Sequence, residues 1–251
     1  MNNVQDQSMI DEVLGKGVMR IAVALTDPPD KGLSEEYYRD PETGKPEGVV
    51  IDYMKLMAGD LGVEPEWVEI PWKDQVDALI SGDIDILPKH TNTPDRALKV
   101  DFADRLISFE VLIVVLKENP QTFSSLNQDN RVIACARGSS NIQLVQHNFP
   151  RAKIVEVDEY LDGAEALESG DVHAWVESPI TKTLLEKRPR LDVIRDSRGE
   201  VAVLSKDYAH PAVKLGDQRA VNWINNWIKF RMARGELDSL VNKRWRSNLL
   251  T

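Results

Sequence analysis

Cysteine is almost absent from this chain of 251 residues, since Cys135 is the single instance. One cysteine excludes a disulfide within the chain, which is compatible with the cytoplasm and does not exclude the periplasm. Cys135 lies in the apolar run Val132–Ala136, so we interpret it as a small buried strand residue rather than a reactive thiol. Long apolar runs are missing too, and no stretch approaches the length needed to cross a membrane.

Basic residues are fewer than acidic ones, 31 against 41, which gives a formal net charge of -10. Phosphate binding needs a basic face, so this balance argues against a nucleic-acid partner. Residues 1–13 lack the basic region and the apolar region of a signal peptide. The chain is therefore either cytoplasmic or a mature chain that begins with a new initiator Met.

Motifs for catalysis and cofactor binding are also missing. The sequence contains no GxGxxG, P-loop, GxSxG or HExxH pattern. We therefore expect no cofactor and no catalytic residue, although spacing cannot reveal groups that only the fold brings together. We also expect no metal site, because the histidines are scattered without ligand spacing: His90, His147, His173 and His210.

What the chain does contain is an alternation of apolar strands and amphipathic helices. Strands are predicted at 18–25, 66–70 and 84–87, and helices near 50–61 and 72–80 lie between them. A second set of strands follows at 131–136, 153–157 and 172–176, and the tail from 213 to 245 has helical spacing. Such alternation predicts an α/β fold with a parallel sheet covered by helices.

Polar groups with binding chemistry concentrate in residues 82–102. A polar loop carrying Lys89 and Thr91 is predicted after the strand, followed by Thr93-Pro94 as N-cap and first turn of a helix. Arg96 lies in that first turn, where the helix dipole disfavours a cation. Either an anionic ligand or a neighbouring acid should compensate it, and the two alternatives are about equal. Without further evidence, Lys89 would be interpreted as a solvated lysine on the protein surface.

Four further candidates follow predicted strands of the second set. Ser139 and Ser140 lie between a strand and a helix, where they could hold an anion or simply cap the helix. Glu177 and Ser178 come after another strand. A carboxylate there could pair with a ligand ammonium group or stabilise the start of the next helix.

Two more candidates belong to the first set. Asp30 lies in a long loop directly after the first strand, at the kind of sheet edge where α/β proteins bind ligands. Trp72 precedes a helix and could line a pocket or pack in the core.

Four segments follow one another in a recognisable order: GVVIDYMKLMAGDLG, ALISGDIDIL after Trp72, TNTPDRALKVDFAD and VNWINNWIKFRMARGELDSLVNKRW. Their order resembles the bacterial extracellular solute-binding proteins of family 3, the polar amino-acid-binding class. The resemblance runs from about Ile10 to Trp245. It implies a type II periplasmic binding protein-like α/β fold, with two α/β lobes joined by two crossing strands and a ligand cleft between them. Lobe one would comprise 1–106 plus 202–251, and lobe two 107–201, with hinge closure on the ligand.

The resemblance also implies roles for individual residues. Arg96 matches the arginine that binds the ligand α-carboxylate, and Thr91 matches a residue that supports the same group. Ser139 and Ser140 match the lobe-two pair that completes this carboxylate site.

Some positions depart from the family pattern. The acid that binds the α-ammonium is matched by Glu177 if one residue is deleted, which we prefer, and by Ser178 in an ungapped alignment. Asp30 replaces a common aromatic, and Lys89 stands where a small residue is usual. Lys89 together with Arg96 suggests extra negative charge on the ligand, as in an acidic amino acid or a dicarboxylate.

The resemblance implies a periplasmic or extracellular protein whose signal peptide is absent from this sequence. We expect a monomer that delivers an amino acid or related carboxylate to an inner-membrane ABC permease. One alternative is the ligand-sensing domain of a membrane receptor. Another is a cyclohexadienyl dehydratase-like enzyme, which we disfavour because Thr181 occupies about the position of that enzyme's catalytic Glu.

Overall fold

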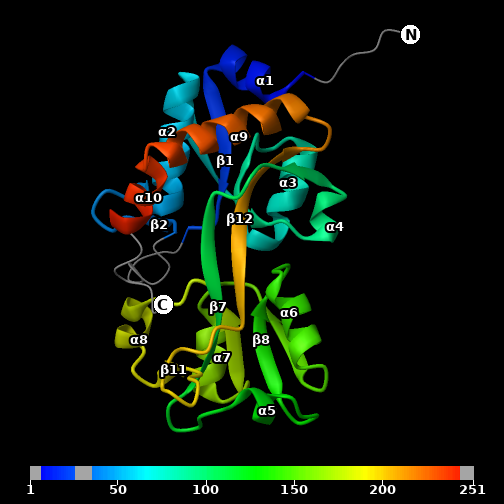
Figure 1. Cartoon of the computed structure of the whole chain (residues 1–251), viewed down its shortest axis with the longest axis vertical. Helices are drawn as coiled ribbons and strands as arrows, with labels where there is room; N and C mark the ends of the chain where they lie inside the picture. Colours follow the sequence, from blue (N-terminus) through cyan, green and yellow to red (C-terminus); the bar gives the residue numbers. More distant parts are fainter. Residues whose placement is uncertain (1–6, 26–35, 244–251) are drawn as a thin grey trace.

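Two long strands join the upper and lower halves of the molecule (Figure 1). The structure is a computed structural model, and it describes residues 7–25 and 36–243. The two strands are β7 (Ile107–Leu116) and β12 (Ser205–Lys214), and they pair antiparallel from Ser205↔Val111 to Ala209↔Ile107. We call the elements before β7 and after β12 the upper lobe, and the elements between these strands the lower lobe.

The upper lobe is built around strands that helices cover. β1 and β4 pair in parallel, whereas β5 and β6 both pair antiparallel with β12. Its elements are α1 (Met9–Lys16), β1 (Val18–Val23), β2 (Tyr38–Arg39), β3 (Pro46–Glu47), α2 (Val49–Leu61), β4 (Glu64–Glu69), the 3-10 turn η1 (Trp72–Asp74), α3 (Gln75–Ser81), β5 (Leu87–Thr91), α4 (Pro94–Ala97), β6 (Val100–Phe102), α9 (Gln218–Ala233) and α10 (Glu236–Val241).

The lower lobe continues the same sheet, whose strand order is β5-β12-β7-β10-β8-β9, with β11 beside β7 and β6 beside β12. β10, β8 and β9 run in parallel, and β7 is antiparallel to β10 and β11. The elements are α5 (Phe123–Leu126), β8 (Val132–Ala136), α6 (Asn141–Asn148), β9 (Lys153–Val157), α7 (Asp162–Ser169), β10 (Ala174–Glu177), α8 (Lys182–Lys187) and β11 (Leu191–Val193).

The predicted α/β alternation is present in both lobes, with two differences. The alternating strands are parallel where β1 pairs with β4 and β8 pairs with β9 and β10, but the molecule also contains β7 and β12, which lie outside the predicted alternation and are antiparallel to every strand they pair with. The polar loop predicted around Lys89 is wrong, since this residue lies in strand β5. β5 pairs with β12 through His210↔His90 and Ala209↔Thr91, and Lys89 is only 7% exposed.

The core runs through both lobes along the buried strand β7. Cys135 is fully buried in β8, as interpreted from the sequence, and burial raises the pKa of its thiol. In the lower lobe, α7 approaches Trp175 so closely that a side chain at Gly163 would overlap the indole ring. Within the described ranges, none of the helices is both long and apolar enough to cross a membrane.

Candidate ligand site between the lobes

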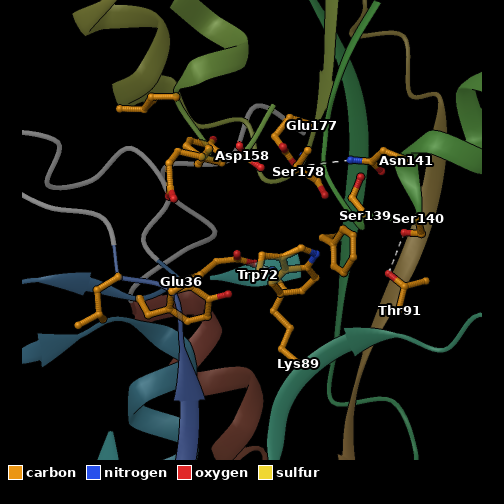
Figure 2. Close-up of a pocket in the computed structure, with 18 residues that line it drawn as sticks. Glu36, Trp72, Lys89, Thr91, Ser139, Ser140, Asn141, Asp158, Glu177 and Ser178 are labelled. Carbon is orange, nitrogen blue, oxygen red and sulfur yellow. Dashed lines mark hydrogen bonds and ion pairs between the residues drawn. The ribbon is translucent and has the colours of Figure 1, made fainter. Parts of the chain in front are cut away.

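A cavity of about 400 Å³ lies between the two lobes and carries polar side chains from both (Figure 2). The upper lobe contributes η1 and β5, the lower lobe contributes the segments that follow β8 and β10, and Phe109 comes from β7. The predicted residues that line this cavity are Trp72, Lys89, Thr91, Ser139, Ser140, Glu177 and Ser178. Asp30, which was also predicted, lies outside the described residues.

Hydroxyl groups from the two lobes meet at one end of the cavity. Thr91 ends β5, and Ser139 and Ser140 lie between β8 and α6. Ser140 Oγ donates to Thr91 Oγ1 at 3.3 Å across the cleft, as Figure 2 shows. Ser139 Oγ is buried and has no hydrogen-bond partner among the described residues. These hydroxyls can therefore donate to an anionic group placed between the lobes.

Arg96 lies beside this end of the cavity and spans the cleft. Thr93 caps α4, since its hydroxyl accepts from the Arg96 backbone N–H at 3.3 Å. The guanidinium donates from Nη1 to the Thr91 carbonyl at 2.9 Å and from Nη2 to the Gly138 carbonyl of the lower lobe at 2.7 Å. Burial lowers the pKa of Arg96 to about 10, so the side chain keeps its charge at neutral pH. Arg96 is not part of the cavity wall that the described residues form.

Glu177 presents a buried carboxyl group to the cavity from the end of β10. Its Oε1 accepts from the Ser178 backbone N–H at 2.9 Å and from Asn141 Nδ2 at 3.4 Å. Burial raises the pKa of Glu177 to about 7, against the opposing effect of the Ser178 N–H. Of the two residues left open by the sequence, Glu177 supplies the carboxyl group here and Ser178 holds it in place.

Lys89 forms a buried ion pair with Glu36, a residue that sequence reasoning missed. The exposed fractions are 7% for Lys89 and 5% for Glu36, and both side chains line the cavity. Lys89 Nζ lies 5.7 Å from the centre of the Trp72 ring and 5.3 Å from that of Phe109, within cation–π range. Burial raises the pKa of Glu36, and the charge of Lys89 opposes this shift. The expectation of an acidic ligand rested on Lys89 together with Arg96, and the ion pair with Glu36 offsets the charge of Lys89.

Trp72 lines the cavity and also packs against a neighbouring ring. The sequence offered a pocket-lining role and a packing role as alternatives, and the residue has both. Its ring stacks on His90 with centroids 4.1 Å apart and planes 2° from parallel. Burial, with the nearby charges of Arg96 and Lys89, lowers the pKa of His90 well below its usual value. His90 is therefore a neutral support that holds the indole against the cavity.

Further contacts cross the cleft. Lys73 Nζ of the upper lobe lies 3.0 Å from Asp158 Oδ1 of the lower lobe, and Arg137 Nε donates to the same oxygen at 2.8 Å. Gln143 Nε2 also donates to Asp95 Oδ2 at 3.0 Å. Together with the bonds of Arg96 and Ser140, these contacts hold the lobes in a closed arrangement.

Two lobes that close over one cavity, with hydroxyls, an arginine and a buried carboxyl group between them, define a two-lobed solute-binding protein. The sequence model of the bacterial extracellular solute-binding proteins, family 3, matches residues 29–247. The chain belongs to this family, as the resemblance predicted.

Relatives with known roles and structures agree with this assignment. The chain is 28% identical over 218 residues to the ABC transporter glutamine-binding protein GlnH of Bacillus subtilis, covering 82% of this chain and 75% of the relative. The ancestral amino acid-binding protein AncCDT-1, a precursor of cyclohexadienyl dehydratase, superposes with a TM-score of 0.81 at 27% identity over 95% of this chain and 100% of that one. The L-cysteine solute receptor of Neisseria gonorrhoeae superposes with a TM-score of 0.79 at 25% identity over 95% and 94% of the two chains. These structures confirm the predicted type II fold.

Proposed function

We propose that this protein captures an amino acid between its lobes by hinge closure and delivers it to an ABC transporter permease. The observation that carries the proposal is the meeting of donors and acceptors from both lobes in one cavity of about 400 Å³. A ligand that bonds to both walls stabilises the closed form over the open one, because only closure brings the two sets of groups together. The curated relative GlnH, a glutamine-binding protein of an ABC transporter, supports the transport role.

The α-carboxylate of the ligand is assigned to the end where Thr91, Ser139 and Ser140 meet. Arg96 joins this site when the carboxylate takes the place of the Gly138 carbonyl as acceptor of its Nη2 group. A carboxylate is the better acceptor, since charge-assisted hydrogen bonds are about twice as strong as those to neutral groups. The buried carboxyl group of Glu177 then accepts from the ligand ammonium group.

The hinge follows from the same topology. We propose that lobe one comprises 1–106 plus 202–251 and lobe two 107–201, with β7 and β12 as the connecting strands. The protein acts as a periplasmic or extracellular monomer in this proposal. A receptor domain would use the same cleft, and a neighbouring permease gene rather than a fused kinase would support transport.

An enzymatic role is disfavoured by Thr181. Its hydroxyl is buried and accepts from the Leu184 backbone N–H at 3.1 Å, which caps α8. A threonine that is occupied in this way cannot replace a catalytic carboxylic acid. We therefore propose a binding protein and not a dehydratase, although AncCDT-1 is described as a precursor of such an enzyme.

A thermal-shift screen of amino acids and organic acids tests the function. A ligand at about 100 times its Kd adds about 2.7 kcal/mol of stability, which raises the melting temperature by about 5–10 °C. The Arg96→Ala variant should bind the same ligand at least about tenfold more weakly, because a charged hydrogen-bond donor is lost. Arg151→Ala is the matched control, since Arg151 is exposed and pairs with Asp129 away from the cavity. Equal binding by Arg96→Ala and Arg151→Ala would contradict the assigned carboxylate site.

A further inference from the structure

The buried pair of Lys89 and Glu36 lies in the part of the cavity that the ligand side chain would reach. This inference rests on the proposed amino-acid-binding function. Figure 2 shows Thr91, Ser139 and Ser140 at one side of the cavity, while Glu36 and Asp158 lie toward the other. An amino acid held by its carboxylate at the hydroxyls therefore extends its side chain past Trp72 toward Lys89 and Glu36.

The two charges of this pair balance each other in a place that water reaches poorly. Lys89 Nζ is enclosed by the Trp72 and Phe109 rings and by the Glu36 carboxylate. In such surroundings an additional charge is strongly felt, because the local dielectric is far lower than that of water. An acidic ligand side chain would be repelled by Glu36, and a basic one would be repelled by Lys89. Either would also compete with the ion pair for its partner, and a buried charge that loses its partner is costly.

Three other acids line the cavity, and one of them, Glu177, is buried and close enough to interact with both Lys89 and Glu36, but the proposed function assigns its carboxylate to the ligand ammonium group. Asp158 is exposed at the mouth and is paired with both Lys73 and Arg137. Glu159, which also lines the cavity, is exposed to solvent, where its charge is screened. The charge next to the end of the ligand side chain is therefore set by Lys89 and Glu36.

We propose that Lys89 and Glu36 form a charge-balanced filter that selects amino acids with a neutral, hydrogen-bonding side chain, above all a carboxamide. A carboxamide carries both a donor and an acceptor on one planar group. Its NH₂ group can donate to Glu36 while its oxygen accepts from Lys89, so both charges keep a partner. The filter thus discriminates by the sign of the ligand charge, and it rejects both signs.

Calorimetric titration of six amino acids tests the filter: glutamine, asparagine, glutamate, aspartate, lysine and arginine. The wild-type protein should bind one of the two carboxamides about 100-fold more tightly than any of the four charged amino acids, a difference that corresponds to the loss of one charged hydrogen bond. In Lys89→Met the order should shift toward lysine and arginine, because the Glu36 carboxylate remains while the positive charge of Lys89 is gone. In Glu36→Gln it should shift toward glutamate and aspartate. Lys99→Met is the matched control, since Lys99 is exposed, and it should keep the wild-type order.

A single variant could fail to fold, because it keeps one charge of the buried pair and removes the other. The double variant Glu36→Gln with Lys89→Met avoids this problem. It removes both charges at once, and it should lose most of the discrimination against charged ligands while its melting curve stays cooperative. If amino acids bind but the wild type prefers an acidic or basic one, the filter is refuted and the proposed function stands. If all three variants keep the wild-type order of ligand affinities, the filter is likewise refuted and the proposed function stands. If none of the six binds and the wider screen finds no amino acid, the proposed function itself fails, and the filter with it.

Discussion

Ligand binding should depend on pH through Glu177, because burial holds the pKa of this residue at about 7. An ammonium group is bound well by the ionised carboxylate and poorly by the neutral acid. Below pH 7 the carboxyl group must release its proton before it can accept the ligand ammonium. Binding therefore weakens as the pH falls, and the ligand has to displace the proton.

The size of the effect follows from this pKa. Affinity should fall about tenfold per pH unit well below pH 7 and level off above it. Between pH 8 and pH 5.5 the loss is about 30-fold, or about 2 kcal/mol. Of the neighbouring groups, Glu36 forms an ion pair with Lys89. His90 stays neutral, because its pKa is lowered well below the usual value.

Isothermal titration between pH 5.5 and pH 8 measures this dependence directly. Repeating the titration at pH 6 in buffers of different ionisation enthalpy should show close to one proton released per ligand bound. The Glu177→Gln variant should bind more weakly at pH 8 and lose the pH dependence. A constant Kd across this range in the wild type, or the same slope in the variant, would refute the role given to Glu177.

The ligand-free protein should respond to pH in the opposite direction. The pKa of Glu177 rises from 4.5 to about 7 in the folded state, so the neutral acid is favoured by folding. Its contribution to stability is therefore complete below pH 4.5 and is lost as the pH rises to 7. Glu177→Gln should be more stable than the wild type at pH 8, by up to about 3 kcal/mol, and the gain should shrink at pH 5. Urea denaturation at the two pH values measures this, and an equal gain at both would contradict it.

Two glycines lead to further predictions. Gly48 has φ +133°, and a Cβ there would overlap the carbonyl oxygen of Glu36, so Gly48→Ala should lose about 1–3 kcal/mol of stability and weaken ligand binding. Gly44→Ala is its control, because Gly44 also has positive φ but open space around it; equal losses of binding in the two variants would contradict the link to the site. Gly163→Ala should cost about 1–3 kcal/mol through its overlap with Trp175, as measured by urea denaturation, with ligand affinity retained in the folded protein.

Strand β12 shows which part of the fold escapes a sequence-based prediction. Its residues 205–212 belong to no predicted strand, and they precede a tail predicted as helical from 213. The strand contains Pro211, which lacks a backbone donor, and the register with β5 shifts between His210 and Ala212, where a bulge can accommodate a proline. β12 is held by β5, β6 and β7, which lie about 100 residues earlier in the chain, so its local sequence carries little of the signal. The helices and parallel strands were predictable because their apolar periodicity is local.

The site residues likewise fall into two groups, those that local sequence motifs reveal and those that only the fold reveals. Thr91 and Ser140 lie in recognisable motifs at the end of a strand and before a helix, and both line the cavity. The burial of Lys89 could not be predicted, because it comes from pairing with β12 and from Glu36, which lies 53 residues away in sequence. A buried lysine needs an acid nearby, and this was the available signal, but the sequence offers 41 acids and does not say which one.

The connection through β7 and β12 has a mechanical consequence. Two strands that share a ladder from residues 107 to 111 and from 205 to 209 form a narrow ribbon. Such a ribbon resists sliding of one strand along the other, because every backbone hydrogen bond of the ladder would have to break. It bends much more readily in the direction perpendicular to its flat face. We therefore expect the lobes to move along one path, so that each closure brings the hydroxyls of Ser139 and Ser140 back to the same position beside Thr91.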